Sequence, residues 1–144
     1  MLISYPALFY YDETESVPYY IFFPDLQTSG TQGNSISEAI AMASEHLGIH
    51  LAHLIENGYD VPTASNINDL HLIHNNPFKD TNNFLLDKSF ISMVNADVAE
   101  YLGEQEMVKK TLSIPKWADR IGKELQLNFS KTLTDAITKE KLRA

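Results

Sequence analysis

Three polar side chains near the C-terminus have the type and the spacing needed to contact nucleic acid. Lys109, Thr111 and Ser113 occupy every second position of the segment 108–114. The intervening positions are mostly apolar: Val108, Leu112 and Ile114. Successive side chains of a strand point to opposite faces, so this alternation predicts a strand with one polar and one apolar face. A lysine and two hydroxyls on a ribbon can reach base edges in a major groove. Lys110 departs from the alternation, and we expect it to point inward or to lie at a frayed end.

Two helices are predicted to follow this strand and to position it. Pro115 can begin the first helix, where its missing N–H has no helical partner to lose. Trp117, Ile121 and Leu125 then recur at helical spacing. Asn128 can cap a second helix. The apolar stripe of that helix is Phe129, Leu133, Ala136 and Ile137.

This tail is too small to fold alone and resembles a known DNA-binding fold. Residues 108–144 form a piece of 37 residues whose single strand has two unpaired edges. Pairing with a second copy across a two-fold axis would bury four helices against an antiparallel ribbon. The run from Lys109 to Pro115 resembles the ribbon-helix-helix family. The resemblance implies that Lys109, Thr111 and Ser113 contact bases, and that Asn128 to Ser130 offer a helix N-terminus to a phosphate.

Charge is divided unevenly along the chain. Residues 1–107 hold two basic and fifteen acidic side chains, a formal charge of −13. Residues 108–144 hold nine basic and four acidic side chains, a formal charge of +5. The imbalance favours a polyanion as the partner of the tail and a basic protein as the partner of the body. Charged surfaces without any partner are the alternative explanation.

The body, residues 1–103, is predicted to be an α+β domain. Apolar and aromatic runs at 6–11 and 19–23 indicate a hairpin, and glycines at 30 and 33 leave room for a short third strand around Thr31-Gln32. Ser35 and Glu38 match a capping box that begins a helix of roughly 20 residues ending before Gly58. Residues 66–87 are expected to be mostly loop. Residues 90–98 form a fourth strand, and a short helix through Tyr101 completes the order β-β-β-α-β.

This body also resembles a family, the HicB antitoxins. The motifs that carry the resemblance are Phe23-Pro24-Asp25-Leu26, the run 31–35, Glu38-Ala39, Ala43, Glu45, Gly58 and the run 61–65. The resemblance implies a sheet and helix like those of double-stranded-RNA-binding domains. It also implies that the partner is the toxin HicA, a small basic messenger-RNA ribonuclease that the antitoxin occludes. Where the family has Pro-Gly-Cys, this chain has Gln27-Thr28-Ser29.

Other chemistry receives less support from the sequence. His46, His50 and His53 share one helix stripe, a spacing that can hold zinc or nickel, but surface histidines are the more common outcome. Two of the carboxylates Asp25, Glu38 and Glu45 could be paired for hydrolysis in a nuclease, although Asp25 is better explained as the cap of a turn and Glu38 as part of the capping box. We therefore expect no catalytic residues, no metal site and no cofactor. Without cysteine, a thiolate nucleophile is excluded.

Aromatic pairs in the first two strands suggest a contact surface. Because neighbours on a strand face opposite sides, one ring each of Tyr10-Tyr11 and Tyr19-Tyr20 is expected on the outer face of the sheet. Such rings in acidic surroundings suit a basic protein, with RNA stacking as the competing use.

These observations predict a two-domain antitoxin. Residues 1–103 neutralise a HicA-type toxin, residues 104–107 are a hinge, and residues 108–144 form a homodimer that binds the operator of its own operon. Whether dimers pair into tetramers stays open. The N-terminus shows no signal peptide and no run approaches a membrane span, so a cytoplasmic protein is expected. The alternatives are a transcriptional repressor whose body senses a small ligand, and a nuclease.

Overall fold

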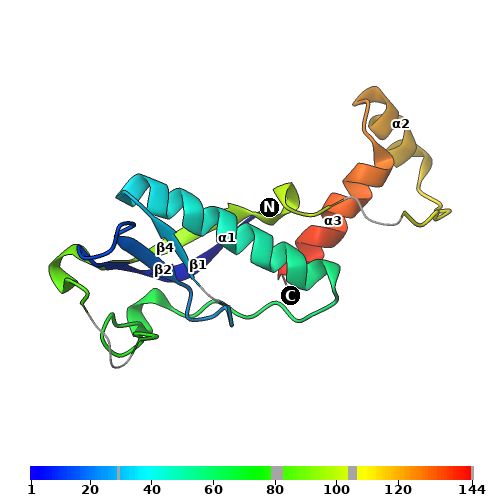
Figure 1. Ribbon diagram of the computed structural model, residues 1–144. Helices are drawn as coiled ribbons and strands as arrows, with labels where there is room; N and C mark the ends of the chain where they lie inside the picture. Colours follow the sequence, from blue (N-terminus) through cyan, green and yellow to red (C-terminus); the bar gives the residue numbers. More distant parts are fainter. Residues whose placement is uncertain (29, 79–82, 104–106, 144) are drawn as a thin grey trace. The chain divides into compact units, whose positions relative to one another are not determined.

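The protein folds into two compact units in the computed structural model, which describes residues 1–28, 30–78, 83–103 and 107–143 (Figure 1). The first unit is Met1–Leu102 and the second is Gly103–Ala144. The expected hinge at 104–107 lies, except for Met107, outside the described residues.

The first unit is built on a four-stranded antiparallel sheet in the order β3-β2-β1-β4. The strands are β1 (Leu2–Tyr11), β2 (Tyr19–Phe22), β3 (Thr31–Gly33) and β4 (Phe90–Asp97). The long strand β1 lies between β2 and β4, with Leu8 opposite Phe22 and Phe9 opposite Phe90. The predicted order β-β-β-α-β is therefore confirmed. Residues 5–10 of β1 are all buried, on both faces of the sheet.

Helix α1 (Ile36–Glu56) covers one face of this sheet. It begins because the Ser35 side chain caps it: the Glu38 backbone N–H donates to Ser35 Oγ over 3.1 Å. The second half of the predicted capping box is wrong, because the Glu38 carboxylate instead accepts from Asn34 Nδ2 at 3.4 Å. The face against the sheet comprises Ala39, Ala43, Leu47, Gly48, Leu51 and Ala52. At Gly33 a Cβ atom would come within 2.6 Å of the Ala39 backbone nitrogen, so strand β3 and the helix need a glycine there.

The opposite face of the sheet is covered by irregular chain, which runs beneath it in green in Figure 1. The Tyr10 hydroxyl donates to the Leu72 carbonyl over 2.7 Å, and the Phe84 ring lies 4.7 Å from the Tyr10 ring. Phe78 packs edge-on against Tyr20 at 5.1 Å. The expectation of an outward ring is therefore wrong for Tyr10, which described residues of the segment between α1 and β4 cover, whereas Tyr20 stays partly exposed.

Short 3-10 turns connect the remaining parts of the first unit. They are Ile67–Asp69, Leu86–Lys88 and Val98–Glu100. The short helix expected through Tyr101 is thus a single 3-10 turn that ends before it. The Tyr101 ring packs so tightly on α1 that a Cβ at Gly48 would lie 2.3 Å from it.

The second unit consists of an extended lead and two helices, α2 (Lys116–Glu124) and α3 (Phe129–Arg143). Helix α2 ends in a Schellman turn: the Leu127 N–H donates to the Gly122 carbonyl at 2.9 Å and the Gln126 N–H to the Lys123 carbonyl at 3.1 Å. The two helices meet closely where Gly122 lies against the Phe129 ring. Both predicted helices are confirmed.

Candidate functional site

The predicted base-contacting side chains lie in the lead to α2. Lys109, Thr111 and Ser113 are all exposed, and residues 107–115 belong to no helix or strand in the single chain. Pro115 stands at the N-cap position of α2, one residue before the expected helix start. A ribbon needs a second strand, so a single chain leaves the strand at 108–114 a prediction.

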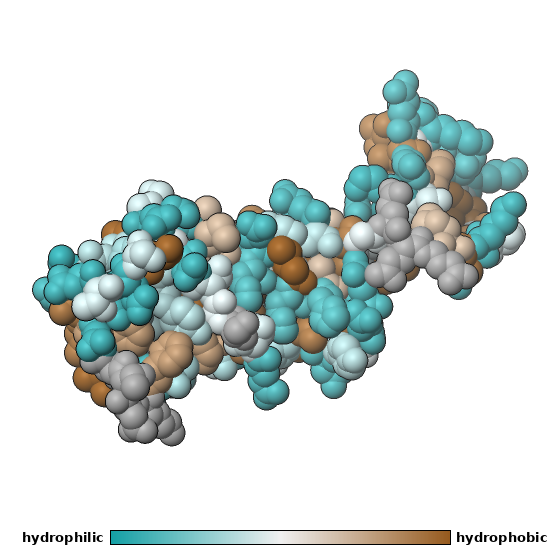
Figure 2. All heavy atoms as spheres, in the orientation of Figure 1, coloured by the Kyte–Doolittle hydropathy of each residue, from teal (hydrophilic) through white to brown (hydrophobic). Residues whose placement is uncertain are grey.

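The C-terminal unit exposes most of its large apolar side chains. Val108 is 83 % exposed and Leu112 58 %, and both belong to the stripe predicted to face inward. The helices add further exposed residues: Trp117, Ile121, Leu125, Leu127, Phe129, Leu133 and Ile137. Only Gly122 and Thr138 are buried among the described residues of this unit. Hydrophobic side chains accordingly reach the surface over α2 and α3 (Figure 2). A monomeric unit would leave this apolar surface in water.

The start of α3 holds the two other predicted DNA-contacting residues. Asn128 caps the helix, because its Oδ1 accepts from the Lys131 N–H at 3.0 Å, as the sequence predicted. Ser130 is exposed in the first turn. Because Asn128 already takes one backbone donor, an anion there would meet the remaining N–H groups of the first turn.

Ion pairs within the helices of the C-terminal unit neutralise its acidic side chains and leave a net positive charge on the remaining lysines. All four acidic side chains pair with a basic neighbour on the same helix: Asp119 with Lys123, Glu124 with Arg120, Asp135 with Lys131 and Glu140 with Arg143. The positive charge left over therefore lies on lysines that have no acidic partner within the described part of the chain. These lysines are Lys109, Lys110, Lys116, Lys139 and Lys141. Three of the five lie in or beside the predicted ribbon.

In the first unit, hydrogen bonds join the motif 23–26, which precedes α1, directly to the run 61–65, which follows it. Asp25 Oδ2 accepts from the Ser65 N–H at 2.9 Å, and Asp25 Oδ1 accepts from the Ser65 hydroxyl. The Tyr5 hydroxyl donates to the Pro62 carbonyl beside this contact. Burial, with the nearby Asp25 charge adding to it, raises the pKa of Tyr5. Asp25 thus fastens the segment that follows α1 and does not cap a local turn, which corrects our expectation.

The histidine stripe of α1 packs as stacked rings. His46 stacks on Phe23 at 6.1 Å and on His50 at 6.5 Å, and His53 Nδ1 lies 3.2 Å from Asn57 Nδ2. Burial lowers the pKa of His50, and the neighbouring His46 and His53 lower it further. Within the described residues no group of three histidine or acidic side chains could hold a metal ion. Glu38 and Glu45, the other carboxylates considered for catalysis, are exposed on α1.

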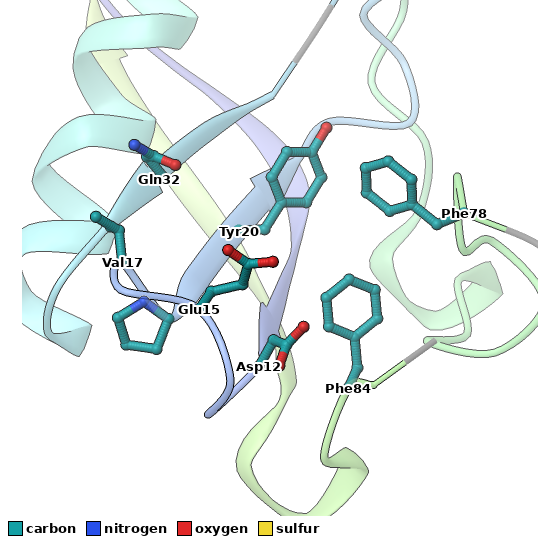
Figure 3. A pocket seen from close by; sticks show the side chains of 8 residues that line it. Asp12, Glu15, Val17, Tyr20, Gln32, Phe78 and Phe84 are labelled. Carbon is teal, nitrogen blue, oxygen red and sulfur yellow. The ribbon is translucent and has the colours of Figure 1, made fainter. Parts of the chain in front are cut away.

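A pocket of about 260 Å³ opens beside the β1–β2 hairpin (Figure 3). Its lining comprises Asp12, Glu15, Val17, Pro18, Tyr20, Gln32, Phe78 and Phe84. Sequence reasoning missed it, because Phe78 and Phe84 lie in the stretch without helical or strand periodicity. The only signal was the presence of two aromatic residues in a loop rich in Asn and Asp.

Comparison with known proteins identifies the family of this fold. The family model described as "HicB_like antitoxin of bacterial toxin-antitoxin system" matches residues 5–132. The chain therefore belongs to the HicB-like antitoxin family of bacterial toxin-antitoxin systems. No curated protein matches it. Within the described residues, no helix is long and apolar enough to cross a membrane.

Two solved structures are similar over nearly the whole chain. A chain of the "Toxin-Antitoxin complex from Streptococcus pneumoniae" is 58 % identical, with a TM-score of 0.71 over 98 % of this chain and 100 % of that one. The Burkholderia pseudomallei antitoxin HicB is 23 % identical, with a TM-score of 0.52 over 94 % of this chain and 96 % of its own. The second likeness concerns the fold alone.

Proposed function

We propose that this antitoxin binds and occludes a HicA-type messenger-RNA ribonuclease and represses its own operon by binding operator DNA. The formal charge of −13 on residues 1–107 suits a basic toxin, and the 58 % identity to a chain of a toxin–antitoxin complex supports such a partner. It acts in the cytoplasm, where messenger RNA is available. The likeness of its sheet and helix to double-stranded-RNA-binding domains stays a prediction.

The second half of the proposal concerns residues 108–144. They form a ribbon-helix-helix homodimer in which residues 108–114 pair with their copy and turn Lys109, Thr111 and Ser113 toward bases. Asn128 and Ser130 lie at the phosphate. The observation that carries this proposal is the exposed apolar surface of the C-terminal unit combined with unpaired lysines at its lead. A two-fold copy would cover the apolar surface and double the positive charge.

A gel-shift titration on the DNA upstream of the gene tests the ribbon. Lys109→Ala and Thr111→Ala should each weaken specific binding by about 1–3 kcal/mol while leaving the circular dichroism spectrum unchanged. Lys139→Ala is the matched control, since it removes a lysine that also lacks an acidic partner but lies near the end of α3. If the Thr111→Ala protein binds the operator as tightly as the parent, the groove-facing assignment is wrong.

Co-expression tests the toxin half. If a HicA-type protein is encoded beside this gene, cells that express it should recover growth when the antitoxin is supplied. The absence of both a neighbouring toxin gene and growth rescue would favour a repressor without a toxin partner.

A further inference from the structure

The pocket beside the hairpin combines aromatic walls with two carboxylates. The aromatic walls are Tyr20 from β2 and, from the irregular layer, Phe78 and Phe84. The carboxylates of Asp12 and Glu15 come from the loop that joins β1 to β2. Figure 3 shows both carboxylates directed toward the space that the three rings border. Phe78 and Phe84 also contact each other, with ring centroids 6.1 Å apart, so the aromatic wall is continuous.

The Asp12 carboxylate has one oxygen left for a ligand. Asp12 is only 8 % exposed, and its Oδ1 accepts from both the backbone N–H of Thr14, at 2.9 Å, and the Thr14 hydroxyl, at 2.6 Å. Its Oδ2 accepts no hydrogen bond within the described part of the chain. This oxygen borders the open pocket, so a hydrogen-bond donor that enters the pocket can reach it without breaking a bond within the described chain.

Among the described residues of the first unit, no cation pairs with these carboxylates. The first unit contributes one described lysine, Lys88, and its Nζ lies 5.1 Å from the centroid of the Tyr11 ring. Tyr11 lies one position further along β1 than Tyr10 and so faces the other side of the sheet. Asp12 and Glu15 therefore present negative charge beside aromatic faces, which is an environment suited to a cation.

The size of the pocket limits what that cation can be. About 260 Å³ is below the roughly 300–1,000 Å³ of small-molecule sites, and it suits one long side chain. A guanidinium is planar, stacks on aromatic rings and presents a fork of N–H donors to carboxylates, whereas an ammonium is a compact, strongly hydrated charge. We propose that this pocket receives an arginine side chain of the toxin, with its guanidinium between the Asp12 and Glu15 carboxylates and the rings of Phe78 and Phe84.

This inference rests on the proposed function, because it takes the basic toxin as the source of the arginine. It adds a defined anchor to that function. An arginine that packs on aromatic rings and pairs with carboxylates is a common kind of binding hot spot once the partner covers it, whereas the other acidic groups of the body would mainly accelerate association. The pocket should therefore govern the dissociation rate of the complex.

A pair of neighbouring variants tests the anchor. Glu15→Gln removes one charge in the pocket without changing the shape of the side chain, and Glu13→Gln removes the same charge from an exposed residue of the same loop outside the lining. We measure binding to the full-length antitoxin by surface plasmon resonance, using the HicA-type toxin as the partner. Glu15→Gln should raise the dissociation rate about tenfold or more, and Glu13→Gln less than about threefold.

A second measurement tests arginine binding in the pocket independently of whether the antitoxin binds a toxin. N-acetyl-arginine amide is titrated into the full-length antitoxin, with the aromatic resonances of Phe78 and Phe84 followed by NMR and N-acetyl-citrulline amide as the uncharged control. Saturable shifts with arginine alone, absent in Glu15→Gln, support the pocket even if the toxin does not bind. If toxin binding is tight but the two variants dissociate at equal rates, or if citrulline shifts the rings as arginine does, the arginine anchor is overturned while the antitoxin function stands.

Discussion

At the scale of single residues, Gln126 carries a backbone conformation that its side chain disfavours. It is the one described non-glycine residue with positive φ, at 55°, and it occupies the turn position where helices usually place glycine. Gln126→Gly should therefore stabilise the C-terminal unit by about 0.5–1 kcal/mol. Thermal unfolding of the full-length protein measures the gain. Gln126→Ala, which keeps the Cβ, should bring none; equal gains for both variants would contradict the assignment.

Tyr10 makes stability depend on alkaline pH. Burial raises the pKa of Tyr10 to about 12, from an ordinary value near 10. The folded state then holds a proton that the unfolded state releases above pH 10, so stability is complete below pH 10 and falls as the pH rises toward 12. Tyr10→Phe should reduce that loss and leave the part that Tyr5 contributes, although it removes the bond to the Leu72 carbonyl and costs about 1 kcal/mol at pH 7. Denaturant unfolding at pH 7 to 11 measures both effects, and an unchanged alkaline slope would be the contrary result.

The sequence analysis failed most often for contacts between residues that are far apart in the chain. The motifs around Asp25 and Ser65 were recognisable as motifs, yet their hydrogen bonds join residues 40 positions apart. Local rules describe neighbours on a strand or helix, so they assigned Asp25 to a turn. Asn128 was predicted correctly because a helix cap depends on the next three residues alone.

At the scale of elements, the spacing of apolar residues predicted a helix or strand correctly where only one of its faces is buried. It failed where both faces are buried. Helix α1 and strand β4 were predicted to within about two residues, because each has a regular pattern. Strand β1 was predicted as a half-exposed hairpin strand, although its run from Tyr5 to Tyr10 shows no alternation, which is typical of a strand buried on both faces. Its second cover is irregular chain, which has no period to detect.

The segment 108–114 allows a direct test of the proposed dimer. Leu112 is 58 % exposed in the single chain but would be buried in the shared core of a symmetric ribbon. Leu112→Asp would bury an unpaired carboxylate there, at a cost of several kcal/mol, so the tail should dissociate to monomers. Sedimentation at micromolar concentration measures the change.

Thr111→Asp is the matched control for that test. It introduces the same charge one residue away, on the face proposed to point toward DNA, so the dimer should survive while operator binding is lost. A Leu112→Asp protein that stays dimeric through its tail would contradict a ribbon centred on this segment.

At the scale of the whole molecule, the two units differ in whether they can fold alone. The first has a sheet with both faces covered, whereas the second buries almost no large side chain among its described residues. A fragment ending at Glu106 should therefore fold, bind the toxin and restore growth, with weaker binding because dimer avidity is lost. The same fragment should give no specific shift of operator DNA. Its toxin association rate should fall as salt rises.

Circular dichroism and growth rescue together decide the outcome for that fragment. A folded, soluble fragment that fails to rescue growth would mean that the tail contributes to holding the toxin, and the division between the two units would have to be abandoned. The prediction of this division rests on the asymmetry of charge, which can be read from the sequence without knowledge of the fold.

The irregular layer over the sheet also bears on how long the protein survives in a cell. Chain of this kind is fastened by few backbone hydrogen bonds, so it opens at less free-energy cost than the sheet unfolds, and opened chain is what proteases cut. Phe78 and Phe84 belong to this layer and line the pocket proposed to take an arginine. An occupied pocket would hold the layer closed against the sheet. The lifetime of the antitoxin would then report whether its toxin is present, with the free protein degraded and the complex spared.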